Sequence, residues 1–448
     1  MNQRLSSWRL AGFSAPFIPL FGALMPVTAF LPTLYADDLG LGLGIVGTVF
    51  MLTRFWDVFS DPVFGSISDN IRTRWGRRRP WVVIGAPLLM YSTYMLFVPP
   101  ATVSVGYLTI WLLVFYTALT LSLMSMYAWA MELTSEYNER SRVMGFVQGA
   151  MLVGTILVMI LPALIGTNFM NIAGPVPRSV VLEVMGWFVV IVMPIGVLLC
   201  LSATKEEPAA VKSDADWMEG ARAILKNDGM RRVVLADFFG GLANGIALAV
   251  TILFARHDLG LSIIDATQML LAYYISGFVC IPLWVEVSRR VGKHKALAAA
   301  ALLFFVISVG LYFGLPESNL PLAIVGWALL GICPSAMQFL PRAMMTDVVD
   351  QDRAELNTEA GRSGLYFAFL SLSLKLGFGL AVGIAFPLLA WLGFNPGAEN
   401  PPEVLTRLRQ VFFLLPALAV LPITLLAWNF PIDRSRQQEL IRRIYALD

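Results

Sequence analysis

The feature that most constrains the fold of this chain is a series of twelve long apolar runs. A helix that crosses a bilayer needs about 20 predominantly apolar residues. Runs of this length and apolarity exclude the short alternating strands of a membrane barrel. The runs cover roughly residues 10–35, 43–68, 80–99, 104–131, 143–166, 180–202, 233–256, 264–288, 295–314, 320–345, 362–393 and 407–430. We therefore predict an all-α membrane protein with twelve transmembrane helices.

The composition supports a membrane protein and argues against several function classes. Of the 448 residues, 57% are hydrophobic and 14% are charged, whereas soluble domains are about 45–50% apolar and 25% charged. The net charge of +2 implies no general attraction to nucleic acid. The sequence contains no P-loop and no nucleophile-elbow motif. We expect neither an enzyme nor any catalytic residue.

Positive charges gather in alternate loops and predict the orientation of the chain. Lysine and arginine favour the cytoplasmic side of a membrane. The basic loops follow the second, fourth, sixth, eighth and twelfth runs, and they include Arg72, Arg74, Arg77, Arg78, Arg79, Arg140, Arg142, Lys205, Lys212, Arg222, Lys226, Arg231, Arg232, Arg289, Arg290, Lys293, Lys295, Arg434, Arg436, Arg442 and Arg443. Both termini are therefore predicted to be cytoplasmic. The compact loops favour a bacterial inner membrane.

The longest polar interruption divides the chain into two halves of six runs each. It covers about 203–232, which predicts an N-terminal bundle at 1–202, a cytoplasmic linker at 203–232 and a C-terminal bundle with a cytoplasmic tail at 233–448. The basic turn after the second run has a faint echo after the eighth run. Two repeats that meet near the bilayer midplane are typical of secondary transporters.

Two carboxylates, Asp57 and Asp61, interrupt the second apolar run, and Arg54 precedes them by one turn. The spacing places all three on one helical face. An ionised carboxylate costs roughly 2.5–3.5 kcal/mol at the centre of an inserted helix. Two of them about 6 Å apart repel each other by on the order of 3 kcal/mol at an effective dielectric near 20. The pair predicts a site for a proton or a monovalent cation. A static salt-bridge cluster is the alternative.

Lys375 is a second intramembrane charge, about a dozen residues into the eleventh run. A lysine near a helix end can extend its ammonium to water, but this depth is too great for that to be easy. We interpret Lys375 as a counter-charge for the two acids. The alternative is a lysine at a helix end, with the boundary of the run misplaced.

Charged residues at the predicted cytoplasmic helix ends are candidates for a gate. Asp69 and the turn that contains Arg77 and Arg79 follow the second run, and Arg362 opens the eleventh. The simpler interpretation is that these charges only set the topology. The stronger hypothesis is that Asp69 and the basic turn clasp neighbouring helix ends, and that Arg362 takes part in the same gate.

Two motifs make the chain similar to a known family. The first is Arg54-x-x-Asp57-x-x-x-Asp61-Pro62-x-x-Gly65, and the second is Arg74-Trp75-Gly76-Arg77-x-Arg79-Pro80-Trp81. Together with Tyr116-Thr117, Glu139-Arg140 and the lysine of the eleventh run, they resemble the glycoside–pentoside–hexuronide:cation symporters, the melibiose permease-like members of the major facilitator superfamily. The resemblance covers nearly the whole chain. It implies two pseudo-symmetric six-helix bundles.

The resemblance also implies roles for individual residues. In that family the two acids of the second helix bind Na⁺, Li⁺ or H⁺, which suggests Asp57 and Asp61 as the cation site and, for a sodium-coupled protein, as its metal ligands. Ser60 and Thr117 match the polar residues that assist them. For substrate binding or coupling, Arg54 and Lys375 match the family's arginine and lysine, and Tyr127 matches the aromatic residue that packs on the sugar.

Three positions depart from the family pattern. Where the family uses acids in its first and fourth helices and an arginine in its fifth to hold sugar hydroxyls, this chain has Phe21, Leu123 and Gln148. Buried hydroxyls without partners are costly, so these residues favour a more apolar substrate. The family's vertebrate branch includes a sodium-coupled lysophospholipid transporter.

We therefore predict a symporter that works by alternating access and carries a glycoside or related small solute, driven by Na⁺ or H⁺. The alternative is a Na⁺-coupled transporter of lysophospholipid or another amphiphile, and a remoter one is a membrane receptor that transports nothing. We expect no cofactor other than the coupling cation. The expected partners are the substrate, the cation and the lipid bilayer, and we expect a monomer.

Overall fold

A helix occupies each of the twelve predicted spans in the computed structural model of the chain. The structure describes residues 5–70, 73–133, 137–168, 178–204, 226–356, 363–433 and 436–440, apart from the side chains of some helical residues. The described residues contain no β-strand, only an isolated bridge between Thr73 and Gly76. Ten of their helices are long and apolar enough to cross a membrane, or eleven when one bent pair counts as a single span. The prediction of an all-α membrane fold is confirmed.

The helices of the first half follow the predicted runs closely. They are α1 (Ser7–Ser14), α2 (Phe17–Ala29), α3 (Leu31–Thr33), η1 (Leu34–Asp38), α4 (Leu43–Asn70), α5 (Arg79–Phe97), α6 (Val105–Glu132), α7 (Tyr137–Asn168) and α8 (Arg178–Ala203). The first run is divided into α1, α2, α3 and the π-helical turn η1. Pro16 and Pro32 lie at two of these junctions, where a proline removes one backbone donor and restricts the residue before it.

The second half repeats the alternation of long helices and short loops. Its helices are α10 (Asp228–His257), α11 (Ile263–Val279), α12 (Ile281–Val291), α13 (Lys293–Gly314), α14 (Leu320–Leu356), α15 (Ser363–Trp391) and α16 (Pro402–Trp428). α11 and α12 form one span that bends by 42° at Cys280. The bend precedes Pro282, which cannot donate the next helical hydrogen bond. α14 continues beyond the predicted end of its run at residue 345.

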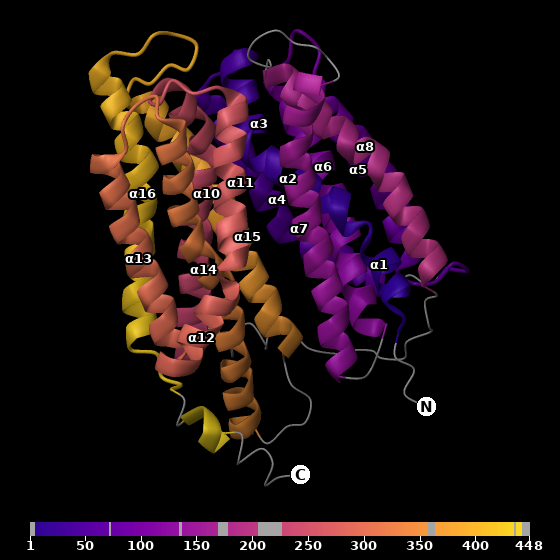
Figure 1. Cartoon of the computed structure of the whole chain (residues 1–448). Helices are drawn as coiled ribbons and strands as arrows, with labels where there is room; N and C mark the ends of the chain where they lie inside the picture. Colours follow the sequence, from indigo (N-terminus) through magenta and orange to yellow (C-terminus); the bar gives the residue numbers. More distant parts are fainter. Residues whose placement is uncertain are drawn as a thin grey trace.

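Most helix contacts lie within one half of the chain. In the first half, α2 packs on α7 and α8, and α5 packs on α6 and α8; in the second, α10 packs on α14, α15 and α16. Between the halves, α4 packs along α15, α2 along α10 and α7 along α11. Figure 1 shows the early helices on one side and the late helices on the other, with α1 and the last described residues, 436–440, toward the same end. We call this the terminal end and the opposite one the far end.

Candidate functional site

The predicted cation site lies on α4 where this helix packs against α15. Apart from Arg54, the helix has no charged residue up to Trp56, and it then carries Asp57, Ser60 and Asp61 without a break before Asn70. Pro62 has no N–H, so the carbonyl of Val58 lacks its usual helical hydrogen bond. The side chains of Asp57 and Asp61 lie outside the described residues, and only their backbone is placed.

Arg54 fixes how α4 meets its neighbours. Its guanidinium lies 4.1 Å from the ring centroid of Tyr116 on α6, a cation–π contact. On the other side it packs on Gly379 of α15, where a β-carbon would lie 2.4 Å from the Arg54 Cβ. Only a residue without a side chain leaves room for the arginine stem at this crossing. The two spans therefore meet directly at the predicted coupling arginine.

The contacts between α4 and α15 also place Lys375. Gly383 lies against Met51, and Gly379 lies against Arg54, so the two helices run antiparallel in this register. Residues four apart lie on one helical face. One turn further, the backbone of Lys375 is therefore level with that of Asp57. The predicted counter-charge and the first acid occupy the same height of the helix pair.

Two hydroxyl groups accompany the acids. The Trp56 indole N–H donates to Thr117 Oγ1 of α6 at 2.9 Å, which holds this hydroxyl next to α4. The Ser60 side chain is buried, and its Oγ has no hydrogen-bond partner among the described residues. Both are neutral oxygen ligands of the kind that accompanies carboxylates in Na⁺ sites, and freed backbone carbonyls act in the same way in transporters. No group of three or more His, Cys, Asp or Glu residues with described side chains lies close together.

The residues predicted to contact substrate lie on α2, α6 and α7. Tyr127 is half-buried, and its ring packs on Phe17 with a centroid distance of 5.3 Å. Its hydroxyl donates to the Met151 sulfur at 3.7 Å. Phe21 and Leu123 are half-buried against the core, and Gln148 is exposed. The three positions that depart from the family pattern thus offer two apolar side chains and one amide.

The structure describes the side chains of two predicted gate residues, Arg77 and Arg79, and not those of the other two. Arg79 donates to the backbone oxygens of Leu201, at 3.2 Å, and Thr204, and its guanidinium lies 5.7 Å from the Trp129 ring. It holds the end of α8, a neighbouring helix of the same half. Arg77 is half-buried in the turn before α5. The Asp69 side chain and all of Arg362 lie outside the described residues.

A lysine and a carboxylate form an ion pair at the terminal end of the second half. Lys293 Nζ lies 2.7 Å from Asp347 Oδ1, which joins α13 to α14. This pair lies at the echo of the basic turn that follows the eighth run of the sequence.

Sequence reasoning missed a pair that connects the halves at the far end. Arg256, at the end of α10, binds Asp37 of η1 with an Nη1–Oδ2 distance of 2.6 Å, and its distance to Asp38 is 3.8 Å. The basic residue was visible in the sequence, but nothing linked it to an acid 219 residues away.

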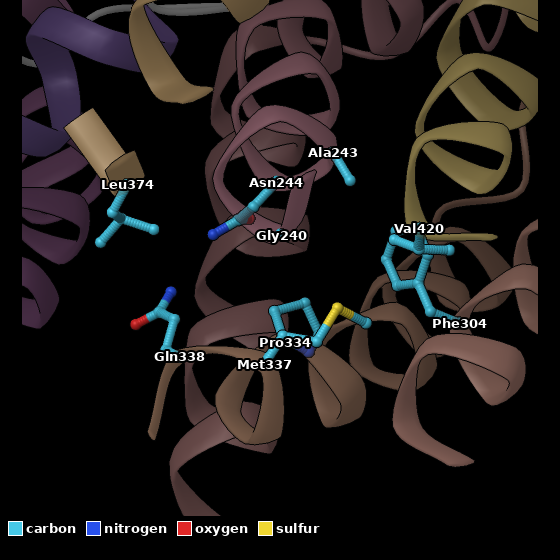
Figure 2. Close-up of a pocket in the computed structure, with 9 residues that line it drawn as sticks. All are labelled: Gly240, Ala243, Asn244, Phe304, Pro334, Met337, Gln338, Leu374 and Val420. Carbon is cyan, nitrogen blue, oxygen red and sulfur yellow. The ribbon is translucent and has the colours of Figure 1, made fainter. Parts of the chain in front are cut away.

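A second missed pair lies inside the second half, between Asp237 of α10 and Arg342 of α14. A carboxylate within an apolar run is the kind of signal that revealed Asp57 and Asp61, so Asp237 was detectable in the same way. Nearby, Gly240, Asn244, Met337, Gln338 and Leu374 line a cavity of about 10 Å³, enough for roughly one water molecule. Figure 2 shows this cavity and its polar side chains, Asn244 and Gln338.

Comparison with known proteins identifies the class. Residues 12–434 match the family described as MFS/sugar transport protein, so the chain belongs to this family of transporters in the major facilitator superfamily. Its structure is similar to that of the nucleoside transporter NupG, with a TM-score of 0.69 at 13% identity, covering 95% of this chain and 99% of the other. It is also similar to a bacterial homologue of the human lysosomal transporter Spinster, with a TM-score of 0.66 at 14% identity over 100% and 99% of the two chains.

The curated relatives include both predicted kinds of transporter. The chain is 24% identical to a glucuronide carrier protein homologue of Escherichia coli K12, over 99% of this chain and 96% of that one. It is 25% identical to the sodium-dependent lysophosphatidylcholine symporter 1 of Gallus gallus, over 87% and 80%. It is 24% identical to the isoprimeverose transporter of Lactiplantibacillus pentosus, over 87% and 81%. The resemblance to the cation-coupled glycoside symporters is confirmed. The protein is an integral, multi-pass membrane protein.

Proposed function

We propose that the protein is a cation-coupled symporter that carries a glycoside or related small solute by alternating access. The observation that carries this proposal is the junction of α4 and α15. There, Arg54 packs between Tyr116 and Gly379, and the backbones of Asp57 and Lys375 lie at one level. Charged residues inside a membrane span are costly and are usually functional. A helix pair that joins the two halves is a suitable place to couple ion binding to the movement of these halves.

The coupling cation in this proposal is Na⁺ or H⁺, bound by Asp57 and Asp61. The Ser60 hydroxyl, which has no hydrogen-bond partner among the described residues, and the Thr117 hydroxyl supply further oxygens for a metal ion. Without a cation, the repulsion between the acids opposes the movement of the halves. Cation binding removes this repulsion, favours substrate binding beside Arg54 and Lys375, and allows the loaded carrier to reorient.

The solute site in this proposal lies at Tyr127, with Gln148, Phe21 and Leu123 around it. The Tyr127 ring offers an apolar face for a sugar ring, and Gln148 offers an amide for hydroxyl groups. The second candidate substrate is a lysophospholipid or another amphiphile. It is favoured by the two apolar residues, which bind an acyl chain better than hydroxyl groups, and by a relative that is a lysophosphatidylcholine symporter.

The arrangement in the membrane completes the proposal. We place the terminal end, with both termini, in the cytoplasm, on the basis of the basic loops, and we propose a monomer in a bacterial inner membrane. The bundles are 1–202 and 233–448, joined by the linker 203–232. Asp69, Arg77, Arg79 and Arg362 form the cytoplasmic gate, supported by the contacts of Arg79 with the end of α8.

Uptake into proteoliposomes tests the proposal. We would compare wild type with Asp57→Asn and Asp61→Asn, using radiolabelled glycosides and lysophosphatidylcholine under a Na⁺ gradient, a pH gradient or neither. Each substitution should abolish uphill uptake, because the cation loses a charged ligand. Asp228→Asn, in an exposed ion pair at the start of α10, is the matched control and should transport normally.

The possible outcomes separate the hypotheses. Uphill uptake in both variants would show that the acid pair does not couple. Absence of flux in wild type under every gradient, with binding retained, would support a receptor. Preference for the glycoside or the lysolipid decides between the two substrates.

A further inference from the structure

Asp237 is a buried carboxylate whose surroundings do not satisfy it. The residue is 0% exposed, and neither of its side-chain oxygens has a hydrogen-bond partner among the described residues. A buried charge without hydrogen bonds is strongly unfavourable unless it is paired. The basic group that faces it is Arg342, with a distance of 3.9 Å between Asp237 Oδ1 and Arg342 Nη1. This exceeds hydrogen-bond length, so the pair is loose.

Arg342 is the more open member of this pair. Its side chain is 42% exposed, against 0% for Asp237, and its Nη1 donates to the backbone oxygen of Gln338 on its own helix. A guanidinium has five N–H donors arranged to bind a carboxylate or phosphate with two parallel bonds. Within the described part of the chain, only the Gln338 oxygen accepts a hydrogen bond from this guanidinium, so most of its donors are available to a ligand.

The open side of Arg342 faces the other half of the protein. Arg342 follows the exposed Gln338 by four residues on α14, so the two side chains share one helical face. Figure 2 shows Gln338 on the side of the cavity where Leu374 of α15 lies. The helices of the first half lie on that side of the view, so Arg342 and Gln338 present a polar stripe toward the first half, which carries the proposed substrate residues.

We propose that Arg342 binds an anionic group of the substrate, a carboxylate or a phosphate, and that Asp237 holds the guanidinium in its place until the substrate arrives. This inference rests on the proposed transport function and specifies its substrate class. A free carboxylate or phosphate forms the two short bonds that Asp237 does not form. The substrate therefore exchanges a loose contact for a close one.

Two matched pairs of probes test the charge on the substrate. Methyl β-glucuronide is compared with methyl β-glucoside, and lysophosphatidic acid with monoacylglycerol, by thermal shift and competition binding to the full-length protein. Wild type should bind the anionic member of at least one pair about tenfold to a hundredfold more tightly. The free energy of hydrogen bonds to a charged group corresponds to a change of that size in the dissociation constant. The pair that shows the preference identifies the source of the anion.

Three variants test the residues. Arg342→Gln should lose the preference and retain the neutral probe, whereas Arg342→Lys, which keeps the charge without the planar fork, should recover part of it. Asp237→Asn should keep the preference or increase it, because the competing carboxylate is gone. Arg290→Gln, an exposed arginine paired with Glu286, is the control and should bind as wild type does.

The outcomes distinguish this inference from the proposed function. The inference is wrong if wild type prefers the neutral probes or binds no anionic probe. It is also wrong if Arg342→Gln keeps the preference for the anion. Neither result changes the outcome expected for cation-driven uptake in the Asp57 and Asp61 variants. Loss of the preference in Asp237→Asn would contradict the competition between Asp237 and substrate. If the preference depends on Arg342 but no cation drives uptake, the anion site stands and the symport proposal fails.

Discussion

At the scale of single residues, Arg54 shows how one intramembrane charge is accommodated. Its guanidinium lies over the Tyr116 ring and its stem packs on Gly379, so three spans from both halves meet around it. The sequence predicted that Arg54 shares a face with the two acids. It did not predict the aromatic or glycine contacts, because these come from helices far away in the chain.

The Trp56–Thr117 hydrogen bond gives a test at the same scale. If Thr117 is a cation ligand, then Trp56→Phe removes the donor that orients its hydroxyl. Such a bond is worth about 0.5–1.5 kcal/mol, so half-saturation by the coupling cation should shift upward by roughly twofold to tenfold. Cation titration of uptake measures this shift.

A matched tryptophan controls for the loss of an indole. Trp391, at the end of α15, is 81% exposed, and Trp391→Phe should leave the cation titration unchanged. An unchanged titration in Trp56→Phe would mean that Thr117 does not need this bond, and would weaken its assignment as a ligand.

At the scale of elements, close approach of two helices depends on small residues at the crossing. On α7, a β-carbon at Gly154 would lie 2.0 Å from the backbone oxygen of Ile18 on α2, whereas a β-carbon at Gly149 would meet nothing within 4 Å. The two glycines lie on the same helix, but Gly154 is in close contact with α2 and Gly149 faces open space. The helical pattern alone does not distinguish them.

This difference predicts opposite effects on stability. Gly154→Ala should destabilise the protein by about 1–3 kcal/mol or more, because the obstacle is backbone and α2 must move away. Gly149→Ala should be neutral or slightly stabilising, since alanine favours helix. Thermal inactivation of the purified variants in detergent measures both, and equal melting temperatures would contradict the close packing of α2 on α7.

At the scale of the whole molecule, the ion pair between Arg256 and Asp37 connects the two halves at the far end. In a carrier that alternates, such a contact forms in one state and breaks in the other. The Asp37 side chain is buried, but Arg256 is half exposed, so water screens the pair and its contribution is about 1 kcal/mol. The ion pair therefore shifts the equilibrium between the two conformations of the carrier but does not hold the protein in one of them.

Breaking this pair should therefore open the far end more often. In Asp37→Asn, spin labels at the exposed loop residues Ala101 and Glu317 should show the longer-distance population raised by up to about fivefold. The exchanged pair Asp37→Arg with Arg256→Asp should restore the original distribution, and Glu286→Gln, within one half, should not alter it. An unchanged distribution in Asp37→Asn would exclude a role for the pair in closure.

The membrane fold follows from the amino-acid sequence, because twelve apolar runs admit only helices in a bilayer. The same pattern identifies Asp57, Asp61 and Lys375 as charges that lipid does not solvate. Which helices meet around these charges is visible only in the folded protein, because side-chain periodicity indicates a helical face and not the helix that packs on it. Three features depend on contacts between distant segments. They are the alignment of the Lys375 and Asp57 backbones, the ion pair of Arg256 with Asp37 and the loose pair of Asp237 with Arg342. Such contacts follow from how the helices pack in three dimensions.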